Sequence, residues 1–137
     1  MKVRILTHEQ LVSEVEAVSI TVMTTEGQIT VLPGHIPLFV PLKTGELNIK
    51  TTDNQTILMA LSGGFIDITG QEVRILADFA RKADDIDELA MQKAIEDAKR
   101  AIEEAKDEQE FSFYQGEMER AMLSLETATK WRKLKNL

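Results

Sequence analysis

Residues 17–24, AVSITVMT, decide the fold class of the first part of the chain. Apolar and polar side chains alternate along this stretch, so Val18, Ile20 and Val22 are expected to point to one face and the residues between them to the other. A period of two is typical of a β-strand, whereas the apolar residues of an amphipathic helix recur every three or four positions. We therefore expect a strand here.

The same alternation continues in short pieces up to about Ala80, in ELNIKT, QTILMAL, FIDIT and EVRILAD. Turn candidates separate these pieces, namely Glu26-Gly27, Thr44-Gly45, Asp53-Asn54, Gly63-Gly64 and Thr69-Gly70. Strands at intervals of about 8–12 residues, with no helix between them, favour an antiparallel sandwich or barrel over a parallel sheet.

The periodicity changes near Asp84. Asp85 with Glu88 fits a capping box that would begin a helix, and Asp107 with Glu110 fits a second one within the interruption KDEQEF. Two helical faces follow: Ala90, Ala94, Ala98, Ala101 and Ala105 in the first helix, and Tyr114, Met118, Ala121, Leu125 and Ala128 in the second. Helices of about 20 and 25 residues with so short a connection are expected to form an antiparallel hairpin.

The sequence therefore predicts a β-sandwich over residues 1–83 and a helical hairpin over residues 84–137. The alanine face of the hairpin lets the helices approach closely but buries little apolar area, which stabilises by only about 25 cal/mol per Å². High helix propensity keeps each helix intact even when it is unpaired. Two interpretations stay open at this point: a hairpin that completes the fold, and one that can rearrange because two packings differ little in free energy.

The composition excludes several classes of function. A net charge of −7 argues against free-standing binding to nucleic acid or to anionic lipid, both of which require a basic face. With no cysteine and only His8 and His35, thiolate and histidine-rich metal sites are excluded. No apolar run approaches the roughly 18 residues that span a bilayer. We expect a soluble protein on the cytosolic side, without insertion into a membrane.

The sequence carries no catalytic motif. It has neither a phosphate-binding glycine loop nor a Gly-x-Ser-x-Gly turn, and a turn or a close backbone contact between strands explains the paired glycines of LSGGF. His35, in ITVLPGHIPLF (residues 29–39), has no nucleophile or metal ligand nominated beside it. We predict that the chain is not an enzyme. The competing interpretation, a small enzyme that uses His35, requires activity from the isolated chain.

Four stretches, read in order, resemble the epsilon subunits of F-type ATP synthases, which are called delta in mitochondria: EGQITVLPGHIPL, LSGGFIDI, VRILADFA and DDID. The resemblance spans essentially the whole chain. It implies a flattened β-sandwich of about ten strands followed by two helices, in a non-catalytic subunit of the rotating central stalk that couples proton-driven rotation to ATP synthesis. A stand-alone β-sandwich adaptor, whose hairpin binds an unrelated partner helix, is the alternative.

The resemblance also implies partners and a location. The partners are the gamma subunit, the ring of c subunits and the catalytic hexamer of alpha and beta subunits, with no cofactor. The location is peripheral, on the cytoplasmic face of the bacterial plasma membrane or an equivalent energy-coupling membrane. In the family, the loop that corresponds to Glu26–Pro37 meets gamma and the c ring. The expected contact residues are Glu26, Gly27, Gln28, Pro33, Gly34, His35 and Pro37.

The physical character of that loop agrees with a binding role. The prolines fix φ and Gly34 can adopt conformations denied to other residues, so the loop is preorganised and loses little entropy on docking. His35 is then a contact residue and not a base. Gln28 stands where relatives often carry glutamate, so a contact with the ring at this position would be neutral instead of charged.

In the family, the hairpin is a regulatory arm that extends along gamma, reaches the catalytic hexamer and inhibits ATP hydrolysis. The basic tip of this arm is expected at Lys130, Arg132, Lys133 and Lys135, which suit acidic segments of the beta subunits. The same cations would also interact favourably with the C-terminus of their own helix.

Some relatives bind ATP on the folded hairpin through an Ile-Asp-x-x-Arg-Ala motif. Here Ala90 replaces the arginine, whose planar donors would hold a phosphate. Asp87, Lys93 and Arg100 are left as the residues that would contact ATP. We therefore expect ATP to bind weakly or not at all.

Overall fold

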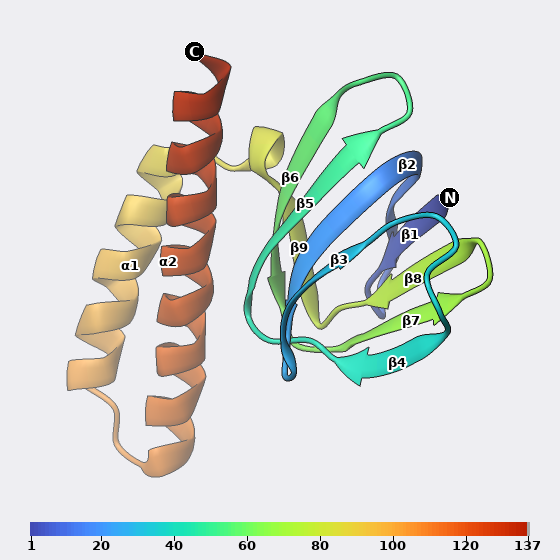
Figure 1. The fold of residues 1–137 in the computed structure, drawn as a ribbon. Coiled ribbons are helices and arrows are strands. Elements are labelled where there is room, and N and C mark those ends of the chain that lie inside the picture. Colours follow the sequence, from blue (N-terminus) through green and yellow to red (C-terminus); the bar gives the residue numbers. More distant parts are fainter. Residues whose placement is uncertain (137) are drawn as a thin grey trace. The chain divides into compact units, whose positions relative to one another are not determined.

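In the computed structural model, which describes residues 1–136, the chain forms two compact units, residues 1–82 and the residues from Ala83 onward (Figure 1). The first unit contains the strands β1 (Lys2–Leu6), β2 (Leu11–Thr24), β3 (Gly27–Val31), β4 (Leu38–Pro41), β5 (Gly45–Thr51), β6 (Thr56–Ser62), β7 (Phe65–Thr69), β8 (Glu72–Leu76) and β9 (Phe79–Lys82). The second contains the 3-10 turn η1 (Ala83–Asp85) and the helices α1 (Glu88–Glu103) and α2 (Glu108–Lys135).

Strand β2 is long enough to belong to both layers of the first unit. Its first half pairs with β1 and its second half with β3 and β5, so β4-β7-β8-β1-β2 form one sheet and β3-β2-β5-β6-β9 the other. Paired strands are antiparallel except for β1 and β8, which are parallel. The predicted sandwich followed by two helices is confirmed, with nine strands in residues 1–136 instead of about ten.

The prediction for the strand around AVSITVMT is right for Ile20 and Val22 and wrong for Val18. Ile20 and Val22 are buried, whereas Val18 is 46% exposed. The pairing of β2 with β5 shifts register between Ala17 and Ser19, so Val18 is an extra residue in the ladder. Such a bulge disrupts the alternation locally and bends the strand. This bend accompanies the passage of β2 from one sheet to the other.

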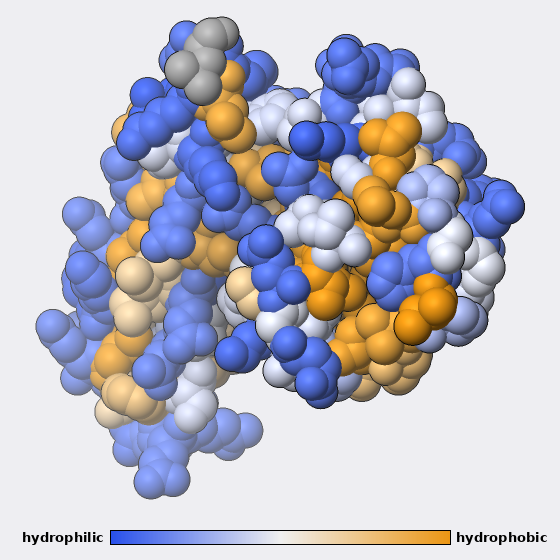
Figure 2. All heavy atoms as spheres, viewed as in Figure 1, coloured by the Kyte–Doolittle hydropathy of each residue, from blue (hydrophilic) through white to orange (hydrophobic). Residues whose placement is uncertain are grey.

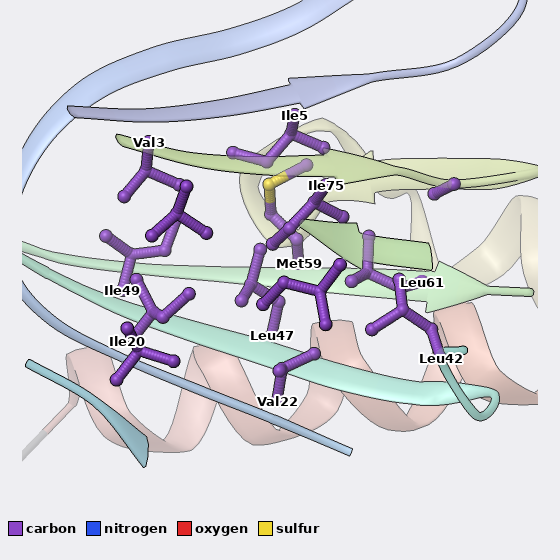
Figure 3. Packing of buried hydrophobic residues seen from close by; sticks show 14 of the residues in the cluster. Val3, Ile5, Ile20, Val22, Leu42, Leu47, Ile49, Met59, Leu61 and Ile75 are labelled. Atoms are coloured by element: carbon purple, nitrogen blue, oxygen red, sulfur yellow. The ribbon is translucent and has the colours of Figure 1, made fainter. Parts of the chain in front are cut away.

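The core lies between the two sheets and consists of their inward-facing residues (Figure 3). Ile5 and Ile75 come from one sheet, and Leu47, Ile49 and Met59 come from the other. All five are fully buried. Truncation of such a side chain, as in Leu47→Ala, typically lowers the free energy of unfolding by about 2–5 kcal/mol. The sandwich therefore has a substantial core of its own, which holds its surface residues in place.

Helix α1 begins two residues later than the sequence predicts. Asp87 is its N-cap, and the Asp87 carboxylate accepts hydrogen bonds from the backbone N–H groups of Leu89 (3.0 Å) and Ala90 (3.2 Å). Asp85 belongs instead to the preceding 3-10 turn, so its backbone lacks the extended conformation that an N-cap requires. The predicted capping box of Asp85 and Glu88 is wrong.

The second cap is correctly predicted at Asp107. Its carboxylate accepts a hydrogen bond from the backbone N–H of Glu110 (2.8 Å), and the Glu110 carboxylate accepts one from the N–H of Lys106 (2.9 Å). α1 and α2 have 16 and 28 residues and run antiparallel (Figure 1). Their buried residues are small, namely Ala98, Ala121, Ser124, Thr127 and Ala128. Ala90, expected on the same face, is exposed in the first turn of α1.

Candidate partner-binding surfaces

A tight turn begins the connection from β3 to β4. The backbone N–H of His35 donates to the carbonyl oxygen of Leu32 (3.1 Å) across Pro33 and Gly34. Proline at the second position and a glycine with a φ of 86° at the third are the signature of a type II turn. Ile36, directly after this turn, is 73% exposed. The turn therefore presents an apolar side chain to solvent from a backbone with little freedom to lose on binding.

The imidazole of His35 is bound to the main chain. Its Nδ1 lies 2.6 Å from the carbonyl oxygen of Ile36, which can only accept, so Nδ1 carries the proton and donates. Among residues 1–136, no group of three or more His, Cys, Asp or Glu side chains could hold a metal ion. A general base needs a partner that orients it toward a substrate proton. The observed hydrogen bond instead fixes the ring of His35 on its own turn.

The structure does not bring all of the expected contact residues together. Glu26, Gly27 and Gln28 lie at the β2–β3 hairpin, where Gly27 has a φ of 105°. Pro33 to Pro37 follow the opposite end of β3. The length of β3 separates the two groups by about 13 Å at roughly 3.3 Å per residue. The expected single loop is therefore two segments, with a strand between them.

A row of apolar side chains crosses the outer face of the sheet β4-β7-β8-β1-β2. We define the apolar row as Pro41, Phe65, Leu76, Leu6 and Leu11, in which each residue is paired by strand register with the next. Phe65, Leu76 and Leu11 are 42%, 45% and 50% exposed. Figure 2 shows apolar residues gathered over β4 and the neighbouring part of β7. Contiguous exposed apolar residues, unlike single ones, mark an interaction site.

The apolar row begins beside the β2–β3 hairpin. Phe39, 62% exposed, stacks on Phe65 with the ring centroids 5.1 Å apart and enlarges the apolar surface. The carbonyl oxygen of Pro41 accepts a hydrogen bond from the backbone N–H of Thr25 (3.0 Å), next to Glu26. Residues of the hairpin and of the apolar row thus lie side by side at one end of the sandwich.

Charged residues on the same sheet face are paired with one another. Arg74 donates a hydrogen bond to Asp67 (2.8 Å). Glu14 lies 3.1 Å from the ammonium of Lys2 and 3.4 Å from the guanidinium of Arg4. The hydrogen bond from Lys2, supported by Arg4, lowers the pKa of Glu14 below its usual range. Arg4 also lies 3.5 Å from Glu72 on the same face. These three cations and three carboxylates balance one another, so they add no net charge beside the apolar row.

The sequence alone does not reveal the apolar row, although it contains part of the signal. In FIDIT, Ile66 and Ile68 are buried, so Phe65 lies on the outer face. In EVRIL, Leu76 lies next to the buried Ile75 and faces outward. Alternation identifies residues that share a face of one strand, but a row across strands requires the register of every pair. That register is a property of the folded chain.

The last turns of α2 carry the expected basic residues, and Arg132 and Lys135 among them contact carboxylates of the hairpin. The Nε of Arg132 donates to a carboxylate oxygen of Glu88 (2.9 Å). The Nζ of Lys135 lies 3.4 Å from Oδ1 of Asp84. The same Oδ1 accepts a hydrogen bond from the indole N–H of Trp131 (2.5 Å). We call Asp84, Glu88, Trp131, Arg132 and Lys135 the clasp.

The clasp lines a pocket of about 310 Å³ in the helical unit, and the other lining residues are Ala83, Ile86, Ala128 and Asn136. Two carboxylates, a guanidinium and an ammonium line it, so their formal charges cancel. The residues expected to contact ATP, Asp87, Lys93 and Arg100, do not line it. The Asp87 carboxylate caps α1, and Arg100 pairs with Asp97 (2.5 Å).

Comparisons with known proteins agree on a family. The family described as ATP synthase, delta/epsilon chain, beta-sandwich domain, matches residues 1–83. The ATP synthase epsilon chain of Alkalilimnicola ehrlichii is 32% identical over 133 residues, which cover 97% of this chain and 95% of that relative. The epsilon chain of Brevibacillus brevis is 36% identical over 104 residues, which cover 76% of this chain and 79% of the relative.

Solved structures share the fold. A chain from the Euglena gracilis mitochondrial ATP synthase, in a structure of its OSCP, F1 and c-ring parts, gives a TM-score of 0.62 at 22% identity. That match covers 96% of this chain and 79% of the other. Within residues 1–136, no helix has both the length and the apolar character needed to cross a membrane.

Proposed function

Because the chain belongs to the ATP synthase epsilon-chain family and is a non-catalytic subunit, we propose that its sandwich binds the gamma subunit and the c ring while its hairpin restrains ATP hydrolysis. A subunit of the rotating stalk needs contacts that stay fixed while the complex turns. The sandwich has its own core, and its exposed apolar residues lie on paired strands and a tight turn.

The observation that carries the binding role is that the sandwich exposes two separate apolar surfaces. One is the apolar row with Phe39, beside the β2–β3 hairpin that holds Glu26 and Gln28. The other is the type II turn with Leu32 and Ile36. Burial of apolar area stabilises a complex by about 25 cal/mol per Å² before the entropy loss of association. Because the surfaces adjoin opposite ends of β3, the sandwich can contact two partners at once.

The length and charge of α2 support the role of the hairpin. With 28 residues, α2 is about 42 Å long at a rise of 1.5 Å per residue. Its last turns carry the basic tip of Lys130, Arg132, Lys133 and Lys135. An extended arm of this length can carry its basic end to acidic segments of the beta subunits, far from the sandwich. Opposite charges would then steer and orient the docking.

ATP has little to bind in the folded hairpin. The pocket at the clasp has no net formal charge, and the arginine and lysine that line it already contact carboxylates. A polyphosphate would have to displace both carboxylates before it could use these cations. We place the chain on the cytoplasmic face of the bacterial plasma membrane, or of an equivalent energy-coupling membrane, as a peripheral part of the synthase catalytic sector.

Reconstitution of the synthase tests both roles in one assay. Full-length protein and a chain that lacks residues 88–137 are each combined with the alpha, beta, gamma and c subunits. We expect equal assembly, because the binding surfaces lie in the sandwich, and faster ATP hydrolysis with the truncated chain. Failure of the truncated chain to assemble would contradict the role of the sandwich. Equal hydrolysis at all nucleotide concentrations would contradict the inhibitory role of the hairpin.

A further inference from the structure

The clasp joins the start and the end of the helical unit. Asp84 lies in η1 and Glu88 is the first residue of α1, whereas Trp131, Arg132 and Lys135 lie in the last turns of α2. Its contacts join residues 44 to 51 positions apart in the sequence. At the other end of the hairpin, the covalent connection between α1 and α2 keeps the helices together. Separation of the helices from their open end therefore has to break the clasp.

The remainder of the hairpin opposes separation only weakly. The fully buried side chains of α1 and α2 are those of alanine, serine and threonine, and the larger Ile95, Ile102 and Leu125 are only half-buried, so the helices share little fully buried apolar area. The hydroxyl of Thr127 donates to the carbonyl oxygen of Leu123 in its own helix (2.8 Å) and not to the other helix. Asp87 and Asp107 cap the two helices individually, so each helix can persist when they part. A few contacts at the open end can therefore determine the equilibrium between the closed and the open hairpin.

We infer that the clasp masks the basic end of α2. Asp84 and Glu88 pair with Lys135 and Arg132, so an acidic partner has to compete with these two carboxylates while the hairpin is folded. The same cations would stabilise the folded hairpin and bind the partner, so each of the two states is formed at the expense of the other. This inference deepens the proposed inhibitory role of the hairpin and rests on it for the identity of the partner.

Lys133 provides an internal contrast. It lies between Arg132 and Lys135 in the sequence, is exposed, and its side chain has no ion pair or hydrogen bond within residues 1–136. It is therefore open to a partner in both states of the hairpin. Replacement of Lys133 removes a docking charge and leaves the clasp intact, whereas replacement of Arg132 affects both.

The opening of the hairpin can be measured in the isolated full-length protein, because Trp131 is its sole tryptophan. Glu88 accepts its hydrogen bond from Arg132, whereas Trp131 donates to Asp84, so a change at Trp131 in Glu88→Gln reports opening rather than the loss of a direct hydrogen bond. The readout is quenching of Trp131 fluorescence by neutral acrylamide, which rises when separation of the helices exposes the indole.

We expect Glu88→Gln to increase the open population by about 1.4- to 5-fold, the range for the loss of one exposed ion pair. Addition of Asp84→Asn should increase it further. High salt, which screens exposed charges, should increase quenching in the wild type more than in the double variant. Asp85→Asn is the matched control, because Asp85 is exposed and has no ion pair in the described chain, and it should behave as wild type.

Identical quenching of Trp131 in wild type and in the folded double variant would contradict the inference that the clasp holds the hairpin closed. In the reconstituted synthase, we expect the clasp variants to inhibit ATP hydrolysis more strongly than wild type and Lys133→Gln to inhibit it less. Increased opening without a change in hydrolysis would support the clasp and contradict the inhibitory arm of the proposed function. A failure of the clasp and a failure of the proposed inhibitory role therefore give different results.

Discussion

Gly64 lies against the main chain of Leu76. A Cβ atom on Gly64 would lie 1.8 Å from the carbonyl oxygen of Leu76 and 2.8 Å from the Cα of Ala77, and Gly64 has a φ of 94°. The segments that follow β6 and β8 can approach this closely only because position 64 has no side chain. The paired glycines of LSGGF therefore mark a close backbone contact between strands, one of the two explanations that the sequence offered.

Gly64→Ala should consequently destabilise the sandwich far more than Gly70→Ala. Gly70 also has a positive φ, of 53°, but a Cβ there would meet nothing within 4 Å. We expect Gly70→Ala to lower the free energy of unfolding by about 1 kcal/mol, the cost of a left-handed backbone alone. Gly64→Ala should lower it by about 3 kcal/mol or more. Urea denaturation measures both, and equal losses would contradict the close contact.

The start of α1 gives a second matched pair. Asp87→Ala removes the N-cap side chain and should lower the stability of the helical unit by about 1 kcal/mol. Asp85→Ala, at the position that the sequence favoured, should change it by less than about 0.5 kcal/mol. Hydrogen exchange of the amides in the first turn of α1 is the direct readout. A larger effect at Asp85 would mean that the helix begins where the sequence predicted.

Local patterns predicted much of the fold. The alternation of apolar residues predicted β2, β5, β6, β7 and β8 but not β1, β3, β4 and β9, and the change of period near Asp84 predicted the two helices. The patterns failed where a choice depended on distant parts of the chain. Both Asp85 and Asp87 can cap a helix, and only the course of the preceding 3-10 turn decides between them. Val18 fits the alternation but is the extra residue of a bulge, because β2 must serve two sheets.

The candidate sites were predictable to a similar extent. The turn at Pro33 and Gly34 and the basic tip of α2 follow from residue type and spacing alone. The separation of Gln28 from His35 by the length of β3 does not, because both stretches read as parts of one loop. Nor does the contact between Arg132 and Glu88, which joins the two ends of the helical unit. The apolar row depends on strand register and the clasp on the packing of the helices, and a single sequence reveals neither.

Glu14→Gln should make the acid sensitivity of the sandwich smaller. The pKa of Glu14 is lowered in the folded protein, by Lys2 first and Arg4 second, so its charge stabilises the fold above the unfolded pKa. That stabilisation is lost as the pH falls through the folded pKa. We therefore expect wild type to exceed Glu14→Gln in stability near neutral pH and the difference to shrink between about pH 5 and pH 3. A difference that stays constant with pH would contradict the assignment.

The type II turn should contribute to assembly and not to the stability of the isolated chain. Ile36→Gln and His35→Ala should each weaken association with the gamma subunit and the c ring by at most about 1–2 kcal/mol, as for a single interface contact. Ile36 is largely exposed, so its replacement should leave the unfolding transition unchanged. Thr52→Gln, on an exposed position of a different turn, is the control. Hydrolysis of any substrate by the isolated chain, abolished by His35→Ala, would refute the binding role.

The claim that the sandwich docks through the apolar row is tested most directly by the affinity of the full-length protein for a reconstituted complex of gamma and the c ring. The comparison is between wild type, the double variant Phe65→Gln/Leu76→Gln, and Thr69→Gln, an exposed position on the same face of β7 as Phe65. We expect the double variant to lose about 2 kcal/mol or more of binding free energy, roughly 30-fold in affinity, while it remains folded. Thr69→Gln should bind as tightly as wild type. Equal affinity for all three proteins would contradict the account.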